Sequence, residues 1–154
     1  MNTNKSIKKL EAIKTLGREH KHGLLLCWKI RAGIKNNIEL SRIKTYADWF
    51  YFTHLIPHFE MEEKYLFPIL GNEHELIKKA NSEHRRIKRL FENETNLLKA
   101  LSLIEEELER LIRFEEHILF NEIQINATYE QLLFLEQTHS EENFVDNLTD
   151  VFWK

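Results

Sequence analysis

Residues 58–67 read HFEMEEKYLF, and residues 111–120, which lie 53 positions later, read LIRFEEHILF. These segments form an internal repeat, because two glutamates, a leucine and a phenylalanine take the same places in both. A second, weaker pairing at an offset of 64 places Glu19-His20 against Glu83-His84. The chain therefore contains two related pairs of helices, the first helix with the second and the third with the fourth.

Apolar residues at three- and four-residue steps predict long helices around these segments. The expected ranges are residues 18–36, 41–70, 72–91 and 97–125, followed by a short amphipathic helix after residue 129. Ser41 and Asn72 are the expected N-caps of the second and third helices. Pro57 is expected to kink or break the second helix, and Gly71 is expected to end it.

Short turns between the four long helices imply that neighbouring helices are antiparallel. The sequence therefore predicts an all-α fold, an up-down-up-down four-helix bundle with a short C-terminal helical extension. We expect residues 1–126 to form the bundle and residues 127–154 to form a C-terminal helix and tail that pack on it.

The composition of the 154-residue chain restricts its function. Lysine and arginine number 22 against 25 aspartates and glutamates, and the resulting net charge of −3 is too balanced for a nucleic-acid or membrane-surface protein. Four glycines and two prolines are too few for an all-β fold, and one cysteine, Cys27, excludes an internal disulfide framework. The polar N-terminus and the absence of a long apolar run predict a cytoplasmic protein without a signal peptide or a membrane-spanning helix.

Four positions of the predicted bundle fall at one level along its axis. In an antiparallel helix pair, residues equidistant from the connecting turn lie side by side. The midpoint of His20 and His58 is residue 39, and the midpoint of His58 and His84 is residue 71. The midpoint of His84 and Leu111 falls between residues 97 and 98. Each midpoint lies in or beside a predicted turn, so we expect three imidazoles at one depth.

These positions are also expected to face the interior. His58 and Glu62 are four residues apart and share one face of a helix. His20 and His84 lie on the apolar stripes of their helices, and Glu115 lies on the inner face of the fourth. Buried unpaired charges are costly, and a metal ion would compensate them. Mixed imidazole and carboxylate donors suit iron, manganese or zinc, and carboxylates can bridge two metals. The predicted metal ligands are His20, His58, Glu62, His84 and Glu115.

Four stretches together form a recognisable pattern. They are REHKHGLLL at 18–26, HFEMEEKYLFP at 58–68, SEH at 82–84 and FEE at 114–116. Over residues 18–123 the chain resembles the hemerythrin-like family, also called HHE cation-binding domains. The resemblance implies that the five predicted ligands hold a non-haem di-iron centre in which Glu62 and Glu115 are able to bridge. Proteins of this kind bind O2 or respond to NO, peroxide or iron, and some are linked to iron–sulfur cluster repair.

Leu111 departs from this pattern, because the repeat and the family both place a histidine there. One metal would lack an imidazole, which leaves a single metal, an asymmetric pair with a water in the gap, or no metal. His117 does not fill the gap, because six residues correspond to about 240° around a helix. His54 shares a helix row with His58 but lies one turn away, and His22 becomes a ligand only if the first helix is rotated.

Other residues near the predicted site have simpler interpretations. Glu63 and Glu116 either hold ligand imidazoles by their second ring nitrogen or lie on a solvated face. His74, His117 and His139 are expected to be solvated or to cap helices. Cys27 is expected to be a small core residue.

The function predicted from these features is metal binding, with non-haem iron in a mono- or dinuclear site. Such a protein would bind or sense O2, NO or other small redox ligands, or handle iron. The alternative is a structural or partner-binding bundle with a decayed metal site, and a third option is an enzyme with oxidative or peroxidatic chemistry. The expected partners are metal ions and a small diatomic or redox ligand, and a homo-oligomer is compatible with the sequence.

Overall fold

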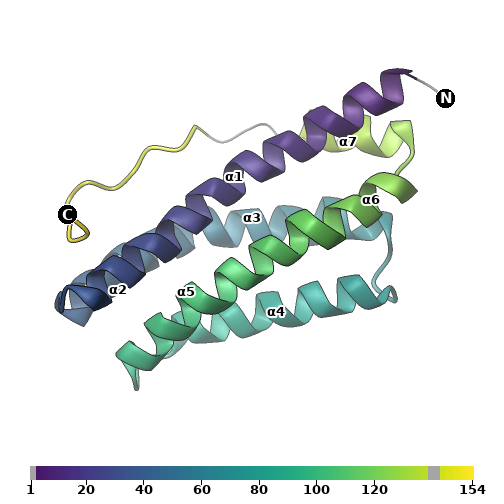
Figure 1. Cartoon of the computed structure of the whole chain (residues 1–154). Helices are drawn as coiled ribbons and strands as arrows, with labels where there is room; N and C mark the ends of the chain where they lie inside the picture. Colours follow the sequence, from purple (N-terminus) through teal and green to yellow (C-terminus); the bar gives the residue numbers. More distant parts are fainter. Residues whose placement is uncertain (1–2, 139–142) are drawn as a thin grey trace.

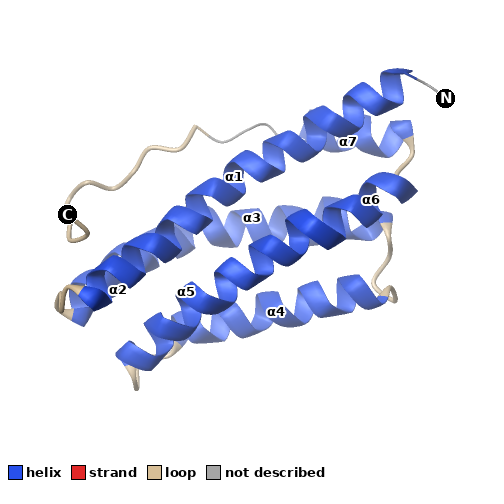
Figure 2. Ribbon diagram, viewed as in Figure 1, coloured by secondary structure: helices blue, strands red, loops and turns tan. Residues whose placement is uncertain are grey.

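The structure of the protein is a computed structural model, and it describes residues 3–138 and 143–154. Side chains are described for residues 14–138 and 143–154. Helices dominate these ranges, and no strand occurs in them (Figure 2). The predicted all-α fold is thus confirmed. In the described ranges, no helix combines the length and the apolar character that crossing a membrane requires.

Long helices pack along one another and form a bundle (Figure 1). The first is α1 (Thr3–Lys35). A second continuous run contains α2 (Leu40–Phe50), a π-helical turn η1 (Tyr51–Leu55), α3 (Ile56–Met61), a π-helical turn η2 (Glu62–Leu66) and a 3-10 turn η3 (Phe67–Ile69). It is followed by α4 (Glu75–Glu92). The last long run contains α5 (Leu97–Phe114), a π-helical turn η4 (Glu115–Leu119) and α6 (Phe120–Asn126), and α7 (Tyr129–Thr138) packs against α1.

Several helix boundaries differ from the prediction. The first helix begins at Thr3 rather than at residue 18. Ser41 is not the N-cap of α2, because that helix begins one residue earlier and the Ser41 hydroxyl donates to the Glu39 carboxylate. Asn72 is not the N-cap of α4. His74 takes that place, and its Nδ1 atom accepts from the amide of Leu76 at 3.1 Å.

Of the predicted kink or break at Pro57, the break does not occur, because the second helical run continues through it. Proline has no amide hydrogen, and its ring crowds the carbonyl one turn earlier. The wider turn η1 comes directly before it, and the amide of Ile56 donates to the carbonyl of Tyr51, five residues back. The wider turn accommodates the proline within a continuous helix. Gly71 ends the run as predicted, with a φ of 92° that favours glycine.

The core consists of two apolar clusters at different heights of the bundle. One contains Leu26, Ile30, Ile87 and Leu108, and the other contains Leu16, Leu66, Ile77 and Leu119 with their neighbours. Cys27 belongs to the first cluster, and burial raises the pKa of its thiol to about 12. Its predicted role as a core residue is confirmed.

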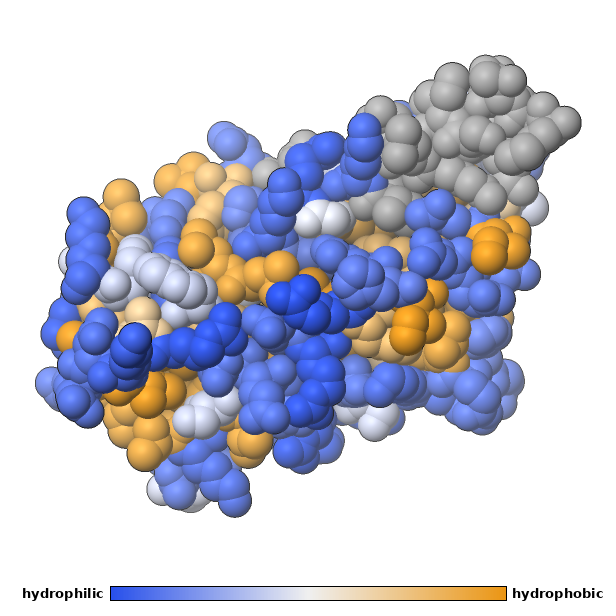
Figure 3. Space-filling model, in the orientation of Figure 1, coloured by the Kyte–Doolittle hydropathy of each residue, from blue (hydrophilic) through white to orange (hydrophobic). Residues whose placement is uncertain are grey.

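Charged side chains form ion pairs between neighbouring helices at the surface. The face seen in Figure 3 is largely hydrophilic, with separate hydrophobic patches. Arg31 of α1 pairs with Glu105 and Glu109 of α5 at 2.7 and 3.2 Å. Arg86 of α4 pairs with Glu107 of α5. Because such exposed pairs contribute little to stability, the apolar clusters carry most of the folding free energy.

Two glycines of α1 provide a matched test of this packing. A Cβ atom at Gly33 would lie 2.7 Å from Cδ1 of Ile43 and 2.9 Å from Cε1 of Phe152. At Gly17, no described atom would lie within 4 Å of it. We expect Gly17→Ala to raise the melting temperature by about 1–3 °C, because alanine favours the helix.

Gly33→Ala should instead lower the melting temperature, because overpacking costs about 1–3 kcal/mol and outweighs the same helix gain. Thermal unfolding followed by circular dichroism measures both variants. An equal rise in both would contradict the close approach of α1 to α2 and to Phe152.

Candidate metal centre

Two buried glutamates stand at the start of matching π-helical turns. η2 begins at Glu62 and η4 begins at Glu115, so the offset of the sequence repeat recurs in the backbone geometry. The amide of Phe67 donates to the carbonyl of Glu62, and the amide of Phe120 donates to that of Glu115. Single π-helical turns are frequent at functional sites. Both carboxylates are thus carried by the first residue of a π-helical turn and point into the interior.

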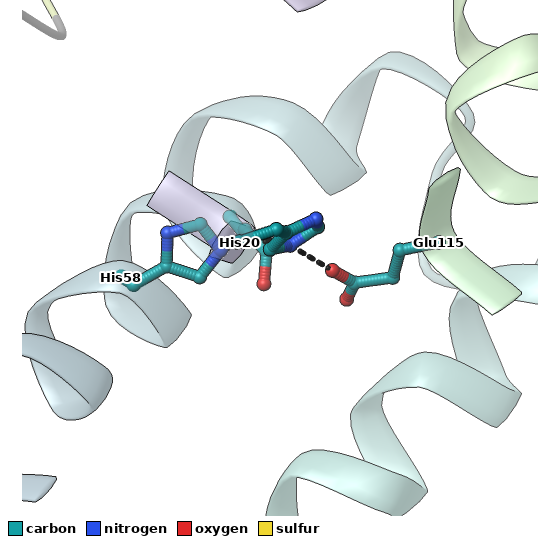
Figure 4. Close-up of side chains that lie close together, drawn as sticks. His20, His58 and Glu115 are labelled. Atoms are coloured by element: carbon teal, nitrogen blue, oxygen red, sulfur yellow. Dashed lines mark ion pairs between the residues drawn. The ribbon is translucent and has the colours of Figure 1, made fainter. Parts of the chain in front are cut away.

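Three imidazoles, carried by α1, α3 and α4, meet these carboxylates. The Nε2 atom of His20, on α1, lies 2.9 Å from Oε1 of Glu115 (Figure 4). The Nε2 atom of His58, on α3, lies 3.3 Å from Oε2 of Glu62. The Nε2 atom of His84, on α4, lies 3.2 Å from Oε1 of Glu62. The structure therefore brings all five predicted ligands together, between the two apolar clusters.

Each carboxylate directs one oxygen toward His84 and the other toward the imidazoles on the opposite side of the site. Glu62 directs Oε2 toward His58 and His20, at 3.3 and 3.8 Å, and Oε1 toward His84. Glu115 directs Oε1 toward His20 and Oε2 toward His84, at 2.9 and 3.4 Å. The site has one half around His20 and His58 and another half around His84. Each half receives one oxygen from each carboxylate.

The first half has the spacing of a metal site. Single ligand atoms from His20, His58, Glu62 and Glu115 all lie within 4.8 Å of one another. The side chains of Glu62 and Glu115 are 0% and 1% exposed, and that of His58 is 11% exposed. A cation placed among them would be held out of water by the bundle.

The second nitrogen of each imidazole contacts an outer carboxylate. Nδ1 of His84 lies 2.7 Å from Oε2 of Glu63, and Nδ1 of His20 lies 3.1 Å from Oε1 of Glu116. The two interpretations left open for Glu63 and Glu116 are thereby resolved in favour of contact with the imidazoles. Such contacts fix the ring orientation and leave Nε2 as the inward donor.

Glu19 performs the same role for His58 and was missed in the sequence. Its Oε1 atom lies 3.0 Å from Nδ1 of His58. The signal was present in the weaker repeat, where a glutamate precedes both His20 and His84. Helical spacing alone does not say which neighbouring helix such a glutamate reaches, so the contact needed three-dimensional information.

The remaining histidines lie outside this ligand group. His54 is buried beside Trp49 and Phe50. His22 is half-buried on α1, and His117 is exposed as predicted. His139 lies outside the described residues. His74 caps α4, and none of the four described side chains fills the place that Leu111 leaves.

Comparison with known protein families matches residues 11–98, more than half of the chain, to the family described as "Hemerythrin HHE cation binding domain". The chain belongs to this family. The match confirms the resemblance found in the sequence. It includes four of the five candidate ligands and ends near the start of α5, before Leu111 and Glu115. Comparisons with curated proteins and with solved structures returned no match.

The electrostatics of this hemerythrin-family site favour a positive charge. Burial lowers the pKa of His20 and His84, but the surrounding carboxylates outweigh it and raise both pKa values well above the ordinary 6.5. The same balance raises the pKa of His58 to about 9. Burial and the charge of Glu62 raise the pKa of Glu115, whereas the nearby imidazoles hold that of Glu62 well below its ordinary value.

The donor atoms at the centre fit a metal ion. The Nε2 atoms of His20, His58 and His84 are buried and make no hydrogen bond of good geometry within the described ranges. The same holds for both oxygens of Glu62 and for Oε2 of Glu115. Buried polar atoms are normally satisfied, so this set indicates a missing partner. A cation in each half of the site would satisfy these atoms, since imidazole and carboxylate donors suit iron, manganese or zinc.

The raised pKa values predict how the metal-free protein responds to pH. A histidine whose pKa is raised on folding stabilises the protein below pH 6.5, and this contribution is lost as the pH rises through the folded value of about 9 for His58. We expect the melting temperature of metal-free protein to fall by roughly 5 °C or more between pH 6.5 and pH 9.5.

Calorimetry of chelator-treated protein across this pH range tests the expectation. His58→Gln should flatten the dependence, and His117→Gln should leave it unchanged, because His117 is exposed and is not one of the candidate ligands. A wild-type melting temperature that stays constant from pH 6.5 to 9.5 would show that these imidazoles are not held in their charged form.

Proposed function

We propose that this hemerythrin-family protein binds non-haem iron in its interior and uses the metal to bind or sense a small redox ligand such as O2 or NO. Iron handling would use the same site. The observation that supports the proposal most strongly is the convergence of three Nε2 atoms on two fully buried carboxylates. The proposed ligands are His20, His58, Glu62, His84 and Glu115.

The proposed setting is the predicted up-down-up-down four-helix bundle. Residues 1–126 would form the metal-binding bundle, with residues 127–154 as its C-terminal extension. In support, the candidate ligands come from α1, α3, α4 and the α5–η4 run, and the apolar clusters lie on either side of them. A site assembled from four helical runs is held in place by the packing of the whole bundle.

Charge and donor type support iron. Five glutamates surround three imidazoles, so the neutral-histidine form of the site carries a large negative charge. A divalent cation offsets it and displaces the protons that the metal-free site retains. Zinc and manganese suit the same donors, but iron also supplies redox chemistry and open coordination positions for a small ligand. The chain orients the imidazoles and excludes water.

The two halves of the site should bind metal unequally. By the two sequence offsets, His20 corresponds to His84 and His58 corresponds to Leu111. The first half has two imidazoles, whereas the half around His84 has one. We therefore place the tighter metal with His20 and His58, and the weaker metal, or an open position, beside His84.

Leu111 stands where the repeat calls for an imidazole, and the glutamate that would contact this imidazole, Glu83, is still present. Glu83 corresponds to Glu19, which contacts Nδ1 of His58. Oε1 of Glu83 accepts from Lys79 at 2.8 Å. Its Oε2 atom is buried and has no hydrogen-bond partner among the described residues. The second half thus keeps the outer carboxylate although Leu111 has replaced the imidazole that would meet it.

Anaerobic titration with Fe(II), followed by elemental analysis, tests the proposal. We expect about one iron per chain to bind tightly, and Glu62→Gln to weaken it at least about tenfold. Glu60→Gln is the matched control, because Glu60 lies two residues away and is exposed. Less than about 0.2 iron per chain, with other first-row metals equally absent, would favour the alternative of a structural or partner-binding bundle with a decayed site.

Leu111→His should rebuild the second half. The new imidazole would lie opposite Glu83 and next to the carboxylates, so we expect the second iron to bind at least about tenfold more tightly. The double variant Leu111→His/Glu83→Gln should lose much of this gain. If Leu111→His leaves the second binding step unchanged, the assignment of unequal halves is wrong.

A further inference from the structure

A small cavity adjoins the imidazoles of the candidate metal centre. Its volume is about 30 Å³, which exceeds the roughly 10–15 Å³ that one water molecule needs. Its polar lining comes from His20, His58 and Glu115 and from Glu19, His22 and His54. The rest of the wall is apolar and includes Leu55, Phe59, Leu108, Leu111 and Ile112. An apolar wall suits a small uncharged molecule better than an ion or a hydrogen-bonding solute.

Leu111 is the apolar residue of this cavity that stands where the repeat calls for a metal ligand. The repeat places a histidine at this position, and an imidazole there would bring a polar nitrogen to the wall. The leucine side chain is 1% exposed and cannot coordinate a metal. The substitution that removes a ligand from the second half therefore adds hydrocarbon to the space next to it.

Phe144 is the one cavity-lining residue that belongs to the C-terminal segment, Asn143–Lys154. Its ring stacks on His22 with 4.1 Å between ring centroids and an angle of 10°. The centroid of His54 lies 4.7 Å away, and those of Trp49 and Phe50 both lie 6.2 Å away. Phe144 is half-buried, so the ring lines the cavity and is also partly exposed to solvent.

The C-terminal segment is held to the bundle just beyond Phe144. Lys29 is 2% exposed, and its Nζ atom contacts Oδ2 of Asp146 at 2.5 Å and the Tyr46 hydroxyl at 2.8 Å. The Tyr46 hydroxyl also donates to Oδ1 of Asp146 at 2.5 Å. Removing one partner of a buried ion pair is strongly destabilising. The backbone next to Phe144 is therefore anchored to the bundle.

Further contacts anchor the end of the segment. Arg42 donates two hydrogen bonds to Asp150, both at 2.8 Å. Phe152 is buried in the first apolar cluster, and the ring of Trp153 lies over Nζ of Lys29 at 3.8 Å. In Figure 1 the segment runs along the bundle toward the end where α1 meets α2. These contacts hold the whole segment against the bundle.

We propose that the C-terminal segment, Asn143–Lys154, closes the cavity beside the metal centre, and that Phe144 controls the passage of small uncharged molecules to it. The proposal rests on the proposed function for the identity of the ligand, since O2 and NO are of this chemical class. Rotation of the Phe144 ring away from His22 opens the path from solvent into the cavity. Because the backbone is anchored, the ring then returns to its stacked position on His22. The effect is on rates of entry and exit more than on affinity.

Nitric oxide binding to the Fe(II) protein, followed by flash photolysis and stopped flow, tests the gate. Phe144→Ala should raise both the association and the dissociation rate about tenfold and change the equilibrium affinity by less than about threefold. Val145→Ala is the control, because Val145 is the next residue and is 70% exposed. Association rates within about twofold of each other in wild type and Phe144→Ala would overturn the proposal.

A second measurement does not depend on the metal. Xenon is an uncharged apolar probe, and its binding to metal-free protein is followed by xenon NMR. We expect faster xenon exchange in Phe144→Ala, and no xenon binding in Leu111→Phe, because the larger ring fills the cavity. Unchanged exchange in Phe144→Ala, or no xenon binding in wild type, would overturn the gate even if iron binds. Faster exchange without iron binding would support the gate and reject the proposed function.

Discussion

Two carboxylates sealed from water in the middle of an apolar bundle are the constraint from which the rest of this structure follows. Glu62 and Glu115 are almost wholly buried, and a buried charge is tolerated only with compensation. Three imidazoles supply it in part, and their pKa values are raised as a result. The imidazoles in turn need orientation, which the outer glutamates provide. One desolvated pair thereby explains the polar layer between the two apolar clusters.

The repeat shows how this layer is built and where it is incomplete. The π-helical turns at Glu62 and Glu115 match, and so do the glutamates that follow them, Glu63 and Glu116. The match fails at Leu111, which takes the place that His58 has in the other segment. Glu83 takes the place of Glu19 in the weaker repeat, and its Oε2 atom is buried without a hydrogen-bond partner among the described residues. The asymmetry therefore appears as a defined local change in an otherwise paired arrangement.

The helices and the convergence of the site were accessible from the sequence because they depend on spacing. Turns at residues 39, 71 and 97 place three histidines at one level, and a four-residue step puts His58 and Glu62 on one face. Spacing does not fix helix rotation to within one side chain, so the contact of Glu19 with His58 was missed. Caps were also misplaced, because Asn72 and His74 are equally polar and only the path after Gly71 decides between them.

The effect of Pro57 and the position of the C-terminal aromatic residues lay beyond sequence reasoning for a related reason. A proline in a helical pattern predicts a break, yet the wider turn at Tyr51–Leu55 accommodates it and keeps His58 on a continuous helix. Likewise, Phe144 is separated from His22 by more than a hundred residues, and no periodicity connects them. Their stacking depends on Lys29, a buried cation on α1 that fixes the path of the distant segment through Asp146. The buried lysine of the C-terminal segment's contact and the buried carboxylates of the candidate metal site follow the same principle, because a buried charge requires a compensating partner.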